Sequence, residues 1–310
     1  VTALSLLLAG TAILGIQSDL IHKGIVLAAI ATLFIMLASR SAISIVNWVA
    51  TSMISPRSLP RMDFSKGIPD KCRTLVAVQT MLTSASSIDD LISVMEISYV
   101  ANRDPNLIYT LVTDFTDSDQ ETLEKDSYLL DYAKNGIESL NKRYAAGSKQ
   151  VFFLLHRKRD WNPSEQKWMG YERKRGKIND LNAFIRGRPG RIINVSGGEQ
   201  DLFKAVRYVI TLDSDTQLPP YAAWKLVGTM AHPLNNPKID EETGCVIKGY
   251  GIMQPMISMS LIGSSASLYS KFFSGDVGID PYTHEISDIY HDLIGTTPFL
   301  GKGIYDVDSF

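Results

Sequence analysis

The sequence predicts an α/β domain with a mostly parallel sheet, preceded by transmembrane helices. Two charge-free apolar runs open the chain, and short β-branched runs alternate with helical segments after residue 60. An Asp-x-Asp motif directly follows one of these β-branched runs. Short apolar strands separated by helices are typical of parallel sheets that helices cover on both faces. We therefore expect a membrane segment over residues 1–55 and a sheet domain over residues 56–310.

The charge balance and the cysteines limit the classes of partner. The 310 residues include 31 Lys and Arg against 33 Asp and Glu, so there is no excess of positive charge to attract nucleic acid. We expect no nucleic-acid partner. Cys72 and Cys245 form no Cys-x-x-Cys pair, which argues against a structural zinc site and against a disulfide framework.

The membrane segment is predicted to contain two spanning helices and one interfacial helix. Residues 1–16 and 24–38 carry no charged side chain, and a spanning helix needs roughly 20 apolar residues. Residues 41–54 mix Trp48 with serine and asparagine, a composition that suits the membrane interface. Arginines follow the second run, and basic flanks favour the cytoplasmic side, so the sheet domain is expected in the cytoplasm. A signal peptide and a buried helical hairpin are the alternatives.

Five apolar runs predict the strands of the sheet domain, at residues 74–79, 107–112, 151–155, 208–212 and 246–253. Helices are expected from Ser86 onward, over 119–146 and over 178–185, with Ser and Asp in the capping positions of the first. Ligands of open α/β sheets gather at the carboxyl ends of the strands. This rule directs attention to the polar residues at those ends, which are Gln79, Asp114, His156 and Asp213.

The pair Asp213 and Asp215 is the candidate metal site. Two carboxylates two residues apart at a strand end can approach one hard cation together, and Mg²⁺ or Mn²⁺ suits such oxygen ligands. A loop that caps the next helix is the plainer interpretation. A phosphatase with a nucleophilic aspartate also uses Asp-x-Asp after a strand. That pattern usually has Thr or Val where this chain has Gln217, which disfavours a phosphatase.

A second Asp-x-Asp pair, Asp306 and Asp308, lies in the last segment of the sequence. Gly301 and Gly303 precede it, and glycines at such positions indicate a sharp turn or a close approach to a ligand. No long apolar strand leads into this pair, so it is the weaker metal candidate.

Residues 157–191 form a basic stretch, with eleven Lys and Arg against four Asp and Glu. A solvated face and a contact with anionic lipid headgroups are the general interpretations. Lys177 is more specific, because it directly precedes the helix predicted over 178–185 and can meet a diphosphate as a point charge. Asn182 lies in the same helix and is expected to add a polar contact.

Four segments carry a resemblance to a known family. Residues 168–187, 208–219 and 299–310 resemble the inverting glycosyltransferases of the cellulose-synthase type, and residues 58–70 are similar too. The closer resemblance is to the cyclic β-1,2-glucan synthases. It implies a GT-A fold, which is a Rossmann-like nucleotide-sugar-binding domain, in a multi-pass enzyme of the bacterial inner membrane. It also implies processive, inverting transfer of glucose from UDP-glucose to a β-1,2-glucan that is built on the protein itself and later cyclised.

The resemblance also implies roles for individual residues. Asp213 and Asp215 would hold the cation and the diphosphate, Asp114 would contact the uridine, and Lys177 would meet the donor phosphates. The expected donor-binding set is Gln79, Asp114, Lys177, Asn182 and Asp213. The expected acceptor-side residues are Gln254, Gly301 and Gly303.

Inverting transfer also needs a carboxylate general base that deprotonates the acceptor hydroxyl. In the family this residue follows the glycine-rich segment, so we expect it beyond Phe310, and we expect this chain to be an excerpt that is inactive alone. A membrane-tethered nucleotide-sugar-binding module without catalysis is the alternative from another class, because the same residues would serve both. The metal-dependent phosphatase is a third, weaker alternative.

Overall fold

The computed structural model describes residues 59–144, 150–198, 200–255 and 301–310, with helical residues at 24, 26–35, 38 and 45 before them. The chain divides into two units, Val1–Ser58 with Met256–Pro298, and Leu59–Pro255 with Phe299–Phe310. Within the described residues, no helix has the length and apolar character that a membrane span requires. Most of the predicted membrane segment, residues 1–55, lies outside the described residues, so its helices remain a prediction.

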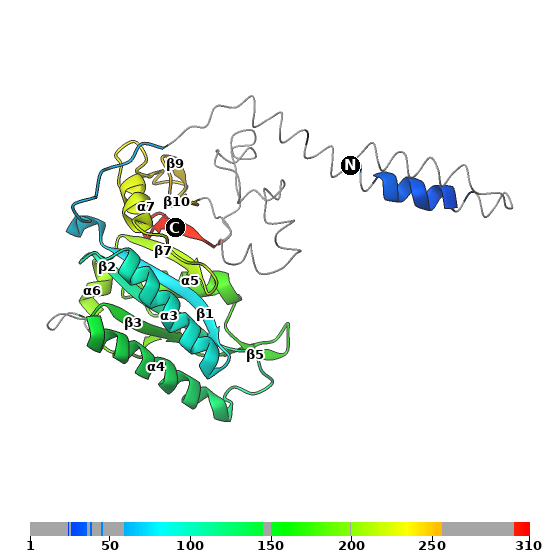
Figure 1. Ribbon diagram of the computed structural model, residues 1–310, viewed down its shortest axis with the longest axis horizontal. Coiled ribbons are helices and arrows are strands. Elements are labelled where there is room, and N and C mark those ends of the chain that lie inside the picture. The colour runs from blue at the N-terminus through cyan, green and yellow to red at the C-terminus, as the bar shows by residue number, and fades with distance from the viewer. Residues whose placement is uncertain are drawn as a thin grey trace. The chain divides into compact units, whose positions relative to one another are not determined.

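The second unit is an α/β domain around one sheet, which has seven strands in the described residues (Figure 1). Their order is β10-β11-β7-β1-β2-β3-β6. The four central strands run parallel, and they are β7 (Tyr208–Asp213), β1 (Thr74–Leu82), β2 (Leu107–Phe115) and β3 (Phe152–Arg157). The outer strands are antiparallel to their neighbours, and they are β10 (Ile252–Met253), β11 (Gly303–Asp306) and β6 (Ile192–Asn194). The predicted α/β class with a mostly parallel sheet is confirmed.

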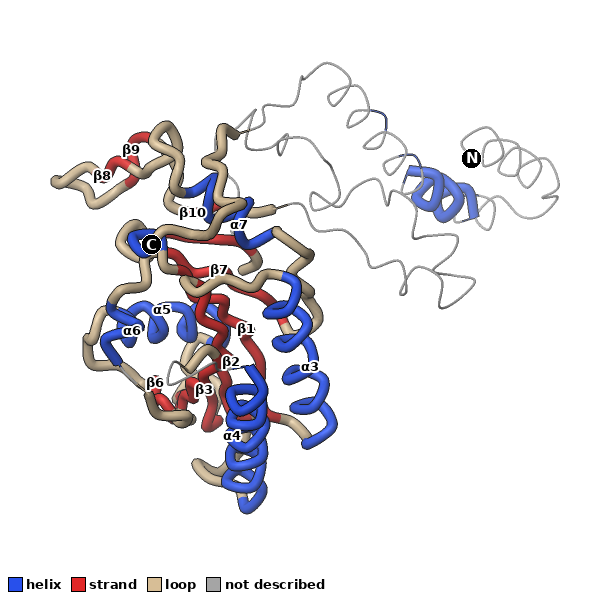
Figure 2. Tube along the Cα trace, turned by 60° about the vertical axis from the view of Figure 1, so that its left-hand side comes forward, coloured by secondary structure: helices blue, strands red, loops and turns tan. Residues whose placement is uncertain are grey.

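Helices cover both faces of this sheet. One face carries α3 (Ala85–Ala101) and α4 (Glu124–Tyr144), and the other carries α5 (Arg173–Ile185) and α6 (Gln200–Lys204) (Figures 1 and 2). The helix α7 (Ala222–Met230) packs into the same core as α3 and α4. The remaining short elements are η1 (Asp70–Cys72) and two hairpins, β4 (Asp160–Asn162) with β5 (Lys167–Met169) and β8 (Lys238–Ile239) with β9 (Val246–Lys248).

The side chains of β1 alternate between two separate cores. Val76 and Val78 are buried in the cluster that contains α3 and α4, whereas Leu75 and Ala77 are buried in the cluster of α5 and α6. Successive side chains of a strand point to opposite faces, so a strand covered on both faces needs apolar residues at every position. Each such aliphatic side chain contributes about 1.5–3 kcal/mol to folding stability when it is buried. Burial on both faces therefore explains why the four parallel strands are continuous apolar runs in the sequence.

The helix α3 begins at Ala85, one residue before the predicted start at Ser86. The Ser87 backbone N–H donates to Ser84 Oγ at 3.2 Å, and the Ser84 N–H donates to Ser87 Oγ at 3.2 Å. This reciprocal capping satisfies two backbone donors that the first turn would otherwise leave unpaired. It fixes the amino end of α3 directly beyond the carboxyl end of β1.

The predicted strand over residues 246–253 is wrong. Val246–Lys248 pairs with β8, whereas Ile252–Met253 pairs with β11 in the main sheet. Between them Gly249 has a φ of +78°, and a Cβ at this position would lie 2.1 Å from the Asn236 carbonyl oxygen. A turn that only glycine tolerates therefore divides the apolar run between two sheets.

Candidate active site

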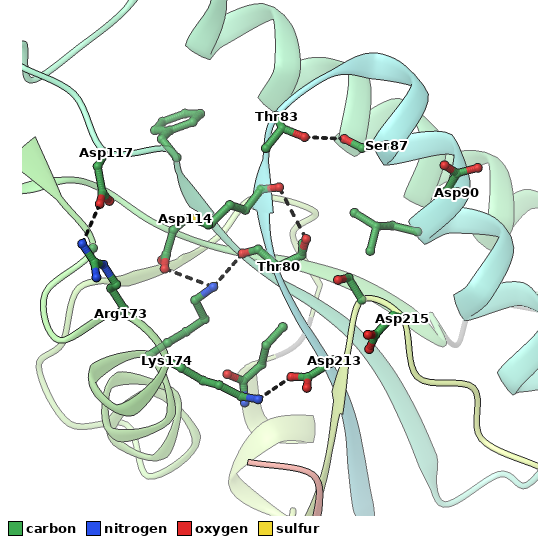
Figure 3. Close-up of a pocket in the computed structure, with 17 residues that line it drawn as sticks. Thr80, Thr83, Ser87, Asp90, Asp114, Asp117, Arg173, Lys174, Asp213 and Asp215 are labelled. Carbon is green, nitrogen blue, oxygen red and sulfur yellow. Dashed lines mark hydrogen bonds and ion pairs between the residues drawn. The ribbon is translucent and has the colours of Figure 1, made fainter. Parts of the chain in front are cut away.

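A cavity of about 570 Å³ lies at the carboxyl ends of β1, β2 and β7. Gln79, Asp114, Asp213 and Asp215 line it together, and the three aspartates are labelled in Figure 3. Parallel pairing brings these strand ends to one edge, and Gln79 is the register partner of Asp213. His156, at the end of β3, is not among the lining residues. Three of the four strand-end residues that the sequence indicates thus meet in one cavity.

The Asp213 carboxylate lies between two ammonium groups. Lys174 Nζ donates to its Oδ1 (Figure 3), and Lys302 Nζ lies 3.2 Å from its Oδ2. Lys302 Nζ also lies 3.6 Å from Oδ1 of Asp215, whose side chain is 79% exposed. Burial lowers the pKa of Lys302, but the hydrogen bond and charge of Asp213 more than offset this effect. The pKa of Lys302 therefore rises, and the ammonium keeps its proton.

The chemistry of the acidic pair fits a divalent cation. Asp213 and Asp215 supply carboxylate oxygens to the same cavity, and Asp213 already attracts positive charge. In the part of the chain that the structure describes, no third His, Cys, Asp or Glu joins them to form a metal-binding group. Mg²⁺ usually takes one or two carboxylates and completes its ligands with water and phosphate oxygens. The donor set suits a cation that enters together with a diphosphate.

Asp114 is held by two buried cations. Arg157 donates Nε to Asp114 Oδ1 at 2.9 Å and Nη2 to Oδ2 at 3.0 Å, while Lys177 Nζ lies 3.0 Å from Oδ2. The other side of the guanidinium donates to Asp180 Oδ2 at 3.0 Å. Burial lowers the pKa of Arg157, and the hydrogen bonds and charges of Asp114 and Asp180 more than offset it, so the pKa rises. A carboxylate has about four acceptor positions, so Asp114 keeps about one for a ligand.

The helix α5 begins at Arg173 instead of at residue 178 as predicted. Glu172 and Arg173 have φ values of 48° and 44°, a left-handed turn that starts the helix early. Lys177 therefore lies inside the helix, where its side chain is 6% exposed and its Nζ donates to the Thr80 carbonyl at 2.6 Å. Burial lowers the pKa of Lys177 although Asp114 opposes this effect. Lys177 lines the cavity as predicted, but it is fixed by β1 and β2.

Gln79 contributes an unpaired, buried side-chain amide to the cavity. Its residue is 7% exposed, and both its Nε2 and its Oε1 are buried without a hydrogen-bond partner among the described residues. A buried amide that lacks partners costs about 1–3 kcal/mol. A side chain that lines a cavity and carries this cost is poised to bind a polar ligand there.

Neither Asn182 nor the predicted acceptor-side residues are among the residues that line this cavity. Asn182 Oδ1 accepts a hydrogen bond from Tyr305 Oη at 2.8 Å, which ties α5 to β11. A Cβ on Gly301 would lie 2.5 Å from Lys174 Cε, and a Cβ on Gly303 would lie 3.3 Å from the Cα of Gln254. The donor role of Asn182 and the acceptor-side roles remain predictions.

The second Asp-x-Asp pair, Asp306 and Asp308, lies at the other end of the sheet. Asp306 is the register partner of Tyr208, the first residue of β7, whereas Asp213 is the last residue of that strand. Asp306 Oδ2 accepts a hydrogen bond from Arg207 Nε at 3.4 Å. This pair therefore does not contribute to the cavity, and Asp306 anchors β11.

One of the comparisons with known proteins agrees with the resemblance stated above. No protein-family model matches the chain. Among curated proteins, the cyclic beta-(1,2)-glucan synthase NdvB of Rhizobium meliloti (strain 1021) is 42% identical over 279 residues, which are 90% of this chain. The resemblance to the cyclic β-1,2-glucan synthases is confirmed. The chain spans 10% of the length of NdvB. The mannosyltransferase Ktr4p from S. cerevisiae aligns over 56% of this chain and 41% of its own at 13% identity, with a TM-score of 0.27 that is too low to indicate a shared fold.

The sequence analysis did not identify three cationic side chains, Arg157, Lys174 and Lys302, as site residues. Arg157 and Lys174 belong to the basic stretch over residues 157–191, and Lys302 stands between Gly301 and Gly303. The interpretation of the basic stretch as a solvated face is wrong for Arg157, whose side chain has 0% exposure. A signal for Arg157 was present in the sequence, because it follows the apolar run 151–155 and Asp114 lies just after the neighbouring run 107–112. A buried charge needs a partner, so this arrangement favours an ion pair between them.

Proposed function

We propose that the protein is a GT-A glycosyltransferase that transfers glucose from UDP-glucose to a growing β-1,2-glucan, with inversion and with the help of Mg²⁺ or Mn²⁺. One observation carries the proposal: an acidic pair, three lysines and an unpartnered amide gather at the carboxyl edge of one parallel sheet. That edge is where open α/β sheets bind ligands. The 42% identity to a cyclic beta-(1,2)-glucan synthase supports glucan synthesis as the reaction.

The donor would lie along the three strand ends. Asp213 and Asp215 would hold the cation, which when bound neutralises charge on a departing diphosphate. The Gln79 amide would gain the hydrogen bonds that it lacks, from the uridine or the sugar hydroxyls. Asp114 would present its remaining acceptor position to the uridine, since Arg157 and Lys177 fix its orientation.

The acceptor and the membrane setting belong to the same proposal. We expect a glucan acceptor, linked to the protein, that lies near Gln254, Gly301 and Gly303. We also expect a multi-pass protein of the bacterial inner membrane, with this domain in the cytoplasm.

Incubation of membranes that contain the protein with labelled UDP-glucose and Mg²⁺ or Mn²⁺ tests the proposal. We expect labelled β-1,2-glucan, sized by chromatography and lacking a reducing end once it is cyclised. Phosphate release without polymer would favour the phosphatase. Saturable UDP-glucose binding with no turnover would favour the nucleotide-sugar-binding module without catalysis.

A further inference from the structure

The Gly-Lys-Gly segment 301–303 delivers a lysine to the acidic pair from a part of the sequence far from the Asp-x-Asp motif. Lys302 Nζ lies 3.2 Å from Asp213 Oδ2 and 3.6 Å from Asp215 Oδ1. No other cation in the described residues forms an ion pair with both carboxylates. Lys302 therefore places a positive charge beside both carboxylates of the acidic pair.

Two glycines make this approach possible. Gly301 has a φ of +82°, and a Cβ there would lie 2.5 Å from Lys174 Cε. At Gly303 a Cβ would lie 2.3 Å from the Met253 carbonyl oxygen. A Cβ at position 303 would collide with a backbone atom and push the segment away from β10, whereas at position 301 the positive φ itself disfavours a residue with a Cβ. The two glycines of the Gly-Lys-Gly segment thus allow the backbone to place Lys302 beside the acidic pair.

The three lysines that pair with Asp114, Asp213 or Asp215 differ in their freedom to move. Lys177 is 6% exposed and is fixed by both Thr80 and Asp114. Lys174 and Lys302 are 39% and 23% exposed. A lysine ammonium on a flexible, partly solvated stem can change partners readily. Lys174 and Lys302 can therefore reach a ligand that enters the cavity, whereas Lys177 serves as a fixed charge.

The charges around Asp213 cannot all remain in place when a divalent cation binds. Two ammonium groups and two carboxylates balance each other in the structure. A cation on Asp213 would bring two further positive charges within a few ångströms of both lysines, and like charges at that range repel strongly. A diphosphate in the same cavity offers these ammonium groups new anionic partners.

We propose that Lys302, together with Lys174, binds the donor diphosphate and leaves Asp213 to the cation when the nucleotide sugar enters. In the free protein the two lysines hold the Asp213 carboxylate in place. This inference rests on the proposed function, because it specifies how the same cavity takes a nucleoside diphosphate.

Binding of UDP and of uridine to the purified protein tests the role of Lys302, since only UDP carries the diphosphate. In the presence of Mn²⁺, Lys302→Met is expected to weaken UDP binding about tenfold, and to leave uridine binding unchanged. Lys302→Arg keeps the charge and should retain most of the UDP affinity. Lys248→Met, which removes an exposed lysine of β9 outside the cavity, is the matched control and should bind UDP as the unmodified protein does.

Titration with Mn²⁺ alone gives a second readout, in which Lys302→Met should raise the affinity instead of lowering it. Without nucleotide, Lys302 competes with the cation for Asp213, so Lys302→Met should bind Mn²⁺ more tightly, by about threefold or more. Electron paramagnetic resonance of free Mn²⁺ measures this change. A lysine with a merely structural role would not produce weaker UDP binding and tighter Mn²⁺ binding in one variant.

The outcomes separate the two proposals. If the unmodified protein binds UDP and Lys302→Met binds it equally well, the role of Lys302 is refuted and the proposed function stands. If Lys302→Met loses UDP and uridine alike and Lys302→Arg does not restore them, Lys302 is a structural tie and the inference is again overturned. If the unmodified protein binds no UDP at all, with or without Mn²⁺, the proposed function fails and the inference fails with it.

Discussion

Asp213 and Asp215 have unequal surroundings although they belong to one motif. The Asp213 side chain is 28% exposed and holds two ammonium groups, whereas the Asp215 side chain is 79% exposed. Asp213 ends β7 and is fixed by the strand, while Asp215 lies in the turn that follows it. We therefore expect Asp213 to set the position of the cation and Asp215 to be needed to retain it.

Asp215→Ala should abolish the cation-dependent part of UDP binding. The variant removes one of two carboxylates but leaves the paired Asp213, so the fold should be unaffected. Calorimetry with UDP and Mn²⁺ should show a loss of about tenfold or more, on the scale of one charge-assisted contact. Removal of the cation by EDTA should cause the same loss in the unmodified protein and no further loss in the variant. Asp131→Ala on the exposed surface of α4 is the control and should bind UDP as the unmodified protein does. If Asp215→Ala bound UDP and Mn²⁺ as tightly as the unmodified protein, Asp215 would not be a ligand of the cation.

Gln79→Leu should stabilise the free protein and weaken its binding of UDP. The leucine has a similar volume and removes a buried amide that has no partner, a cost of about 1–3 kcal/mol. Gln150→Leu is the matched control, because Gln150 Nε2 donates to the Phe152 carbonyl at 3.0 Å and its loss should destabilise the protein. Thermal unfolding and UDP titration measure the two effects. A Gln79→Leu variant that is less stable yet binds UDP normally would contradict the ligand-binding role.

At the scale of secondary structure, Arg157 joins β3 to β2 and α5. Its guanidinium pairs with Asp114 on β2 and Asp180 on α5, and also donates to the carbonyls of Tyr171 and Arg173. Two glycines make room for it, since a Cβ at position 170 would lie 2.6 Å from its Nη2 and one at position 176 would lie 3.1 Å from its Nη1. The guanidinium thus positions the helix that carries Lys174 and Lys177 over the strand ends.

Arg157→Met should destabilise the domain severely. It removes the guanidinium from Asp114 and Asp180, although Lys177 still pairs with Asp114, and removing one partner of a buried ion pair costs about 3–5 kcal/mol. Arg143→Met is the matched control, because Arg143 pairs with Glu96 at 2.8 Å but is 51% exposed. Such surface pairs contribute about 0–1 kcal/mol. Urea unfolding of both variants checks the contrast, and similar losses would show that burial does not set the strength of the Arg157 pairs.

The parallel strands could be predicted from sequence because each is a continuous apolar run buried on both faces. The run over 246–253 failed because Gly249 turns the chain, and periodicity carries no information about a positive φ. The start of α5 was missed for the same kind of reason, since Glu172 and Arg173 are non-glycine residues in the left-handed region. Sequence reasoning thus located the strand ends and missed local backbone turns.

The site could be predicted in part, for a related reason. Gln79, Asp114 and Asp213 lie at or just after the carboxyl ends of predicted strands, so the rule for parallel sheets placed them together from sequence alone. Lys302 lies 89 residues after Asp213 in the sequence (302 minus 213). No strand pattern in the sequence predicted that β11 would pair antiparallel with β7. Contacts made across the sheet edge required the structure.

At the scale of the whole domain, polar groups lie between the two helix layers as well as apolar ones. His156 is 1% exposed, its Nδ1 lies 2.9 Å from Thr113 Oγ1, and its Nε2 has no partner in the described residues. Its ring packs against Phe115 with centroids 4.2 Å apart. A buried imidazole of this kind is kept neutral by the fold, so the stability of the entire domain depends on its protonation.

The domain should therefore lose stability as the pH falls below neutrality. Burial lowers the pKa of His156 from 6.5 to about 4; the charge of Asp114 opposes this shift to a smaller extent, whereas the charge of Lys177 adds to it. Because the unfolded chain binds the proton more readily, the contribution is fully present above about pH 6.5 and is lost as the pH falls toward about 4. Between about pH 7.5 and about pH 5 the loss should be about 2 kcal/mol. Urea unfolding across this range should show a shallower pH slope for His156→Phe, and a slope equal to that of the unmodified protein would exclude His156 as its source.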